Sequence, residues 1–425
     1  MKKFFVSFGL AAAGTASLHA AILDPASKDY KVSATLRGFY DDNYLTSPKK
    51  EGSLGFELSP GFELNLPLPQ TEIGLQYIYG LYYYQKRQDA GQNPFDQTHQ
   101  FDLWIDHAFN PRWDLRLADT VRIAQDPALT SSGTAVTKRV SGNNLANTAN
   151  LSLHTDWTPL VSSSLNYQNV FYRYENRGPA VLPGPPTNVV ASLAGMMDRV
   201  EQTINPEVEW KVSPTTSFHT GYKFGLVNFT AGEVTVFNTN NSSFYTSSSR
   251  DNYSHYGYVG AGHAFLPNLS GNVDAGVQYT KYYNDPAATA AFGPYAQASM
   301  IYTYGPASYA QFGFTLSRNA TDTIKLDTNG RITQDQQSAV AYGSINQPLT
   351  TELVGSVIVR YQHSIFHQGA YDSLSSDFYD LGLNLTYSFS RHLSSEIGYN
   401  FDYYKSAAGG NYTRNRLYLG ITASY

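Results

Sequence analysis

Apolar and polar residues alternate with a period of two along most of the chain from Tyr30 onward. In the clearest stretch, 54–66, leucine and phenylalanine occupy every second position except one, and mostly glycine, serine, asparagine or glutamate lie between them. The same alternation recurs at 73–81, 273–279 and 381–389. Successive side chains of a β-strand point to opposite faces, so this period predicts strands with one apolar and one polar face.

The connections between these segments alternate in length. Short turns are expected at eight places: 67–70, 110–112, 158–160, 213–215, 267–268, 305–307, 347–350 and 391–392. Longer polar links are expected at nine places: 46–52, 87–97, 126–146, 177–195, 231–250, 285–292, 319–332, 367–373 and 407–411. This alternation is typical of outer-membrane barrels, which have short periplasmic turns and longer external loops. The predicted fold class is all-β, a transmembrane antiparallel up-and-down β-barrel of about 18 strands (roughly 16–20).

The last residues of the chain alternate up to the final position. One face of this strand is formed by Leu417, Leu419, Ile421, Ala423 and Tyr425. The segment resembles the C-terminal strand of Gram-negative outer-membrane β-barrels, which ends in an aromatic residue read by the assembly machinery. The resemblance implies that these five residues form an assembly signal and that the barrel assembly machinery is a partner. In a closed barrel this strand pairs with the first one, expected at 32–40.

The N-terminus has the pattern of a secretory signal peptide. Lys2 and Lys3 precede an apolar stretch from Phe4 to Ala13, and small residues follow up to Ala20. We expect a signal peptide at 1–20, a short periplasmic segment at 21–29 and the barrel at 30–425. The apolar stretch is shorter than the roughly 20 residues that a membrane helix needs, and no later stretch approaches that length. The mature protein is therefore expected in the outer membrane, in contact with its lipid.

Composition excludes several kinds of site. The 425 residues contain no cysteine, so disulfides and thiolate metal sites are excluded. Aromatic residues make up 14% and charged residues only 15%, with a mean hydropathy of −0.35, which suits strands that are apolar on one face. The net charge is −5 and no basic patch stands out, so nucleic acid is not an expected partner.

Tryptophans and other aromatic residues lie where strands meet connections. Trp113, Trp157 and Trp210 flank short turns, and amphipathic rings favour the membrane interface. A second group has two interpretations, a belt at the other interface or an inward path on which sugars stack, and the belt is favoured. This group consists of Tyr82, Tyr84, Tyr172, Tyr174 and Tyr418.

Charged residues on the polar faces are the candidate pore lining. The acids assigned inward are Asp41, Glu57, Glu63, Asp102, Asp106, Glu201, Glu207, Glu209, Asp274, Asp380, Glu396 and Asp402. The bases assigned inward are Arg37, Arg116, Arg122, Lys211, Lys223, Arg360 and Arg416. An excess of acids along a water-filled pore raises the local cation concentration, which predicts a mild cation preference. The alternative is that these groups pair across strands and only hydrate the wall.

Other chemistry has little support in the sequence. The histidine spacings, such as His363 with His367, do not favour a metal site. No Gly-x-Ser-x-Gly motif or similar catalytic signature is present, so neither enzymatic activity nor a cofactor is expected. Two positions conflict with the simple pattern. Pro206 suggests a bulge or a shortened strand, and Asp119 places a charge on the face expected to meet lipid.

In pattern, the mature chain resembles the porin-type barrels of Gram-negative bacteria. The resemblance implies a channel for passive diffusion of ions or small hydrophilic solutes, and a homotrimer is one expected assembly. Barrels of about 18 strands usually hold an aqueous channel. Two alternatives stay open: an export barrel for an extracellular polysaccharide, and a structural or adhesion barrel closed by its loops.

Overall fold

The structure is a computed structural model that describes residues 29–125, 142–182, 188–238 and 243–425. The expected signal peptide, 1–20, lies outside the described residues, as does the following segment up to 28.

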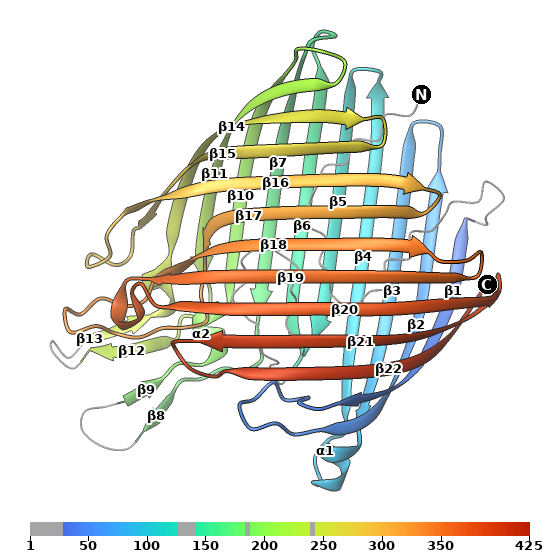
Figure 1. The fold of residues 1–425 in the computed structure, drawn as a ribbon. Coiled ribbons are helices and arrows are strands. Elements are labelled where there is room, and N and C mark those ends of the chain that lie inside the picture. The colour runs from blue at the N-terminus through green and yellow to red at the C-terminus, as the bar shows by residue number, and fades with distance from the viewer. Residues whose placement is uncertain (1–28, 126–141, 183–187, 239–242) are drawn as a thin grey trace.

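Eighteen antiparallel strands form one closed barrel, which confirms the predicted fold class (Figure 1). The first strand, β1 (Tyr30–Asp41), pairs with β2 (Ser53–Pro67) on one side and with the last strand, β22 (Tyr412–Ser424), on the other. The ring therefore has no free edge. The strands between them are β3 (Thr71–Tyr84), β4 (Phe95–Asn110), β5 (Trp113–Ala124), β6 (Asn144–Asp156), β7 (Val161–Arg173), β10 (Arg199–Lys211), β11 (Thr216–Phe229), β14 (Asn252–Leu266), β15 (Leu269–Tyr282), β16 (Ala291–Gly305), β17 (Ser308–Asn319), β18 (Asp335–Pro348), β19 (Leu353–His367), β20 (Ser375–Ser390) and β21 (Leu393–Ser406).

The strands are joined by eight short turns and nine longer connections, each within a few residues of its predicted position. Parts of the predicted connections at 126–146, 177–195 and 231–250 lie outside the described residues. Several long connections carry small elements of their own. These are α1 (Gln85–Asp89), α2 (Leu193–Met197), the 3-10 helices η1 (Ser247–Arg250) and η2 (Gly369–Tyr371), and two hairpins, β8 (Ala180–Leu182) with β9 (Asn188–Val190) and β12 (Val234–Asn238) with β13 (Ser243–Thr246). No helix among the described residues combines the length and apolar character needed to cross a membrane.

The two faces of the barrel wall differ as the alternation predicts. On β1, Leu36 is 57% exposed on the outer face, whereas Asp41 on the inner face is fully buried. The three clusters of buried apolar residues lie toward the ends of strands that carry the long loops. Among the described residues, the buried apolar clusters are therefore gathered at the end of the barrel that carries the long connections.

Both irregular positions have a structural explanation. Pro206 causes neither a bulge nor a shortened strand, so that expectation is wrong. Along its pairing with β11, β10 leaves out only Asn205 and Pro206 and keeps the same register before and after them. On the other side, Pro206 is opposite Leu165 of β7. Asp119 lies on the outer face, where it accepts a 2.6 Å hydrogen bond from Asn147 Nδ2.

Candidate channel site

The inner faces of β1, β2, β21 and β22 form one side of the lumen, here named the β22 wall. Arg37 links two carboxylates, one on adjacent β2 and one on β21, two strands away. Its Nε is 2.5 Å from Glu396 Oε1 and its Nη1 is 2.9 Å from Glu57 Oε1. Glu57 also lies 3.5 Å from Arg416 Nη2. These four residues come from four adjacent strands, and each charge has an opposite charge beside it.

A second layer of ion pairs lies nearer the long loops on the same wall. Arg414 donates two hydrogen bonds to Asp41, the shorter of 2.7 Å, and lies 3.7 Å from Asp402. On the adjoining strands, Arg360 and Asp380 are directly opposite each other in the register of β19 and β20. Sequence reasoning missed Arg414, although its position, two residues before Arg416 on the same face, could have revealed it.

About half a circuit away, the inner faces of β10, β11, β14 and β15 form the β11 wall. Two of its carboxylates accept hydrogen bonds from hydroxyl groups: Glu207 from Tyr258 Oη at 2.9 Å, and Glu209 from Ser162 Oγ at 2.9 Å. Glu209 is also opposite His219 in the register of β10 and β11. Asp274 contacts His219 from two strands away. The contact passes over Gly260 of β14, where any side chain would overlap both partners.

The bases of the β11 wall are held in different ways. Lys223 Nζ lies 4.2 Å above the ring of Tyr256, a cation–π contact. Lys211 lies 3.0 Å from Asp156. Glu201, the third acid of β10, is 2.6 Å from the buried Arg199.

The inner faces of β2 to β5 carry the remaining predicted residues. Asp102 accepts a 2.7 Å hydrogen bond from Thr120, and Asp106 lies 3.6 Å from Arg116. Glu63 is opposite Lys31 and Gln76, and Arg122 is opposite Gln100. All the charged residues assigned inward from the sequence therefore share the polar face of the wall. Their part in conduction belongs to the function proposed below.

One arginine joins three long loops at the extracellular end. The fully buried guanidinium of Arg250 donates to three main-chain carbonyls, those of Met196 at 2.9 Å, Thr321 at 2.7 Å and Gln334 at 3.1 Å. It also lies 4.7 Å above the ring of Phe229. Burial lowers the pKa of Arg250 to about 10. We name the three joined segments, 192–198, 247–251 and 320–334, the loop cluster.

Further contacts bind the loop cluster to its neighbours. Gln334 Nε2 donates to Asp285 at 2.7 Å, and Tyr245 Oη donates to the Gly330 carbonyl. Ile332 in the longest of these segments is fully buried. Burial raises the pKa of the Asp285 carboxyl, against the hydrogen bonds that it accepts. No pattern in the sequence distinguished 320–334 from the other long loops, yet this segment makes most of the contacts described here.

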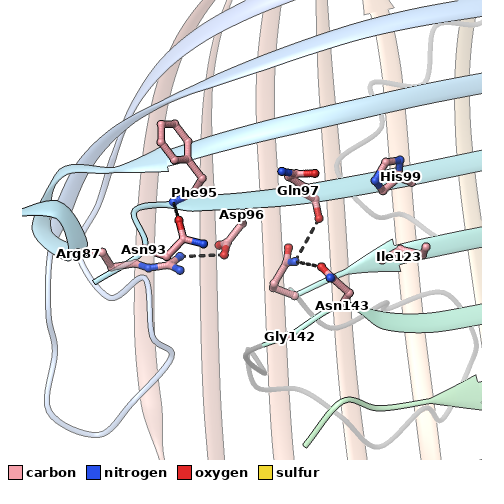
Figure 2. A pocket seen from close by; sticks show the side chains of 10 residues that line it. Arg87, Asn93, Phe95, Asp96, Gln97, His99, Ile123, Gly142 and Asn143 are labelled. Carbon is pink, nitrogen blue, oxygen red and sulfur yellow. Dashed lines mark hydrogen bonds and ion pairs between the residues drawn. The ribbon is translucent and has the colours of Figure 1, made fainter. Parts of the chain in front are cut away.

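A cavity of about 380 Å³ lies at the extracellular ends of β4, β5 and β6 (Figure 2). Its polar groups bind one another: Arg87 pairs with Asp96 at 2.8 Å, and Gln125 Nε2 donates to the Gln97 carbonyl at 3.1 Å. Because these groups are already paired, the cavity alone does not argue for a ligand. Among the described residues, no three histidine or carboxylate side chains are arranged to hold a metal ion.

The aromatic residues divide differently from the sequence expectation. The belt interpretation is wrong for the five tyrosines, which are on the inner side or packed beneath the loops: Tyr82, Tyr84, Tyr172, Tyr174 and Tyr418. They pack there with arginines, for example Tyr172 beneath Arg199 at 4.2 Å. The three tryptophans expected at short turns, Trp113, Trp157 and Trp210, lie beside those turns. Trp157 and Trp210 are exposed, and Trp113 packs edge-on against Trp157 with ring centroids 5.7 Å apart.

Comparison with known proteins identifies the family. The family model described as "Putative beta-barrel porin 2" matches residues 198–425, more than half of the chain. No curated protein matches the sequence. Similar solved structures include Acinetobacter baumannii OccAB4 (12% identity, TM-score 0.41, covering 95% of this chain and 100% of that chain). They also include Pseudomonas aeruginosa OpdQ (13% identity, TM-score 0.42, covering 93% and 98%) and A. baumannii OccAB3 (10%, 0.43, 93% and 100%). The chain belongs to the family described as "Putative beta-barrel porin 2" and is a porin-like barrel of the Gram-negative outer membrane.

Proposed function

We propose that the protein is a channel for passive diffusion of ions or small hydrophilic solutes, with a mild preference for cations and no enzymatic activity. The observation that carries the proposal is the closed barrel of 18 strands with an apolar outer face and a charged inner face. A ring of this size leaves room for an aqueous channel. The expected removal of 1–20 as a signal peptide is part of the proposal, and the mass of the protein isolated from outer membranes tests it.

The pairing of inner-face charges supports the cation preference. Arg37 and Arg416 each have a carboxylate beside them, so their positive charge is compensated locally. Glu207 and Glu209 are instead hydrogen-bonded to hydroxyl groups, which leave the negative charge in place. Because uncompensated negative charge concentrates cations near the wall, the β11 wall is the proposed source of selectivity.

Reversal potentials in planar bilayers under a salt gradient test this proposal. The wild-type protein should favour cations, and a Glu207→Gln/Glu209→Gln double variant should be less selective at a similar conductance. Asp377→Asn is the matched control, since Asp377 lies on the outer face, where it pairs with His363. Anion preference in the wild type would contradict the proposal. The same cation selectivity in the double variant as in Asp377→Asn would also contradict it.

A second candidate is a barrel closed by its loops, and the loop cluster is the observation that favours it. Arg250 and its three carbonyl partners hold these loops together at the extracellular end. Liposome swelling with sugars of graded size separates the two candidates. Correctly folded, heat-modifiable protein that neither conducts nor permits swelling would exclude the diffusion channel and support the closed barrel.

A further inference from the structure

A row of polar side chains crosses the outer face of the barrel. The register places Asp119 of β5 opposite Ala149 of β6, Ala149 opposite Asn169 of β7, and Asn169 opposite Gln202 of β10. Asn147, the next outward position of β6, donates to Asp119. We name Asp119, Asn147, Asn169 and Gln202 the outer polar row.

The row interrupts a surface that is otherwise apolar. The outward positions around it on the same four strands are Leu117, Val121, Leu145, Leu151, Leu153, Leu165, Tyr167, Phe171, Val200, Ile204 and Val208. Leu151, Leu165 and Ile204 are 40–43% exposed, which identifies this face as the outer one. Beyond the ends of the row, the register continues into Leu103 and Leu226.

Contacts among the described residues leave hydrogen-bonding groups of the outer polar row without partners. Asn147 supplies one hydrogen bond to Asp119, a charge that can accept several. The side chains of Asn169 and Gln202 form no hydrogen bond with any described residue, and Gln202 is exposed. Hydrocarbon chains cannot supply the missing partners, and polar residues at membrane depth usually face protein or water. The row therefore requires a polar surface against it.

We propose that the outer polar row is the contact surface for a second copy of this chain. A carboxamide carries both a donor and an acceptor, so a row of amides is complementary to itself. In a two-fold contact the Gln202 end of one row meets the Asp119 end of the other, and an amide donor then faces the carboxylate. The proposal depends on the outer-membrane location and not on conduction.

The absence of cysteine makes the contact straightforward to test by cross-linking. Asn169 lies beside the middle of the row and therefore near the two-fold axis, so an Asn169→Cys variant carries a single thiol that faces its own copy in the partner. A short bismaleimide added to isolated outer membranes should then yield a species of twice the chain mass. Ser395→Cys is the control. Ser395 is also an outward polar residue, but it lies on β21, opposite Tyr387 and Ile421 and far around the ring. It should remain uncross-linked.

A second measurement uses the assembly itself. In mild detergent, light scattering should show an oligomer for the wild type and a monomer for Asp119→Leu/Asn169→Leu/Gln202→Leu. The triple variant should keep its heat-modifiable fold, because leucine suits a face that meets lipid. Ser395→Leu should leave the oligomer unchanged.

Three outcomes would overturn the proposal: a wild type that is monomeric in detergent together with an Asn169→Cys variant that gives no cross-link, a folded triple variant that remains oligomeric, or an Asn169→Cys cross-link to a species of different mass. The last outcome would mean that another membrane protein covers the row. If the triple variant fails to fold, the cross-linking result decides alone.

Discussion

At the scale of single residues, buried charges do the most to organise the extracellular end. Arg250 can serve three carbonyls at once because its planar guanidinium carries five N–H groups in a fixed arrangement. Lysine has no such geometry, and methionine has no donors. One acceptor belongs to the segment 192–198 and two belong to the segment 320–334, while Arg250 itself lies in 247–251. This one side chain therefore links its own loop to two others.

Replacing Arg250 with methionine should loosen the loop cluster without unfolding the barrel. Each buried carbonyl left without a donor costs about 1–3 kcal/mol, whereas the strand ladders are untouched. We expect faster proteolysis of the long loops, larger single-channel conductance and unchanged heat modifiability. Arg331→Met is the control, because Arg331 is partly exposed in the same segment and its side chain pairs with Asp327, four residues away. Equal protease sensitivity of the two variants would contradict this role.

The Asp285 carboxyl should make the loop cluster sensitive to pH. Its folded pKa is raised above the ordinary value of 3.8, so the folded loops bind the proton more tightly than opened ones. Its contribution to closure is therefore complete below pH 3.8 and is lost as pH rises through the folded pKa.

A spin label on the Asn329→Cys variant would report this change, with mobility that increases as pH rises through that window. Asp285→Asn should remove part of the response, and buried Asp198, whose pKa is also raised, should account for another part. A response that is identical with and without Asp285→Asn would exclude the residue as its source.

At the scale of strands, the alternation of apolar and polar residues was enough to predict the fold, because it indicates the face of the strand on which each side chain lies. Alternation predicted β10 well, and it could not show that β10 keeps its register through Pro206 by omitting only two pairings. It placed His219 and Asp274 on the same face but could not show their contact, which depends on an absent side chain at Gly260 between them.

Gly260→Ala should therefore destabilise the barrel. Its Cβ would overlap both His219 and Asp274, and overpacking of this kind typically costs about 1–3 kcal/mol. Gly257→Ala is a matched control on the same strand, since a Cβ there meets nothing within 4 Å. Urea unfolding followed by tryptophan fluorescence should show a lower midpoint for the first variant only. Equal midpoints would show that the wall relaxes around the new methyl group.

The closing strand should govern assembly more than stability. Tyr425 exchanges two main-chain hydrogen bonds with Val32, of 2.8 and 2.9 Å, and its ring stacks on His392. We expect Tyr425→Ser to reduce the heat-modifiable fraction in outer membranes several-fold. Tyr387→Ser, on the outer face of β20, is the control. A normal assembled fraction for Tyr425→Ser would contradict the assembly signal.

At the scale of the whole molecule, the sequence predicted the ring but not what fills its extracellular end. Strand positions and connection lengths can be predicted because they produce local, periodic patterns of apolar and polar residues in the sequence. The carbonyl partners of Arg250 are 54, 71 and 84 residues away, and such contacts leave no pattern in a single sequence. Inner-face charges were predicted by position, whereas the pairing that compensates many of them depends on neighbouring strands.

Because Val32 and Tyr425 are hydrogen-bonded partners, the first and last strands are neighbours in the ring, and a chain that begins at another hairpin would contain the same strand pairs. A short linker from Tyr425 to Tyr30, with a new opening at 267–268, would give a circular permutant with both termini periplasmic. Its last strand would be β14, which ends with exposed Phe265 on the outer face. We expect this permutant to assemble, as measured by heat modifiability in outer membranes. A permutant opened at 407–411, with extracellular termini, should fail.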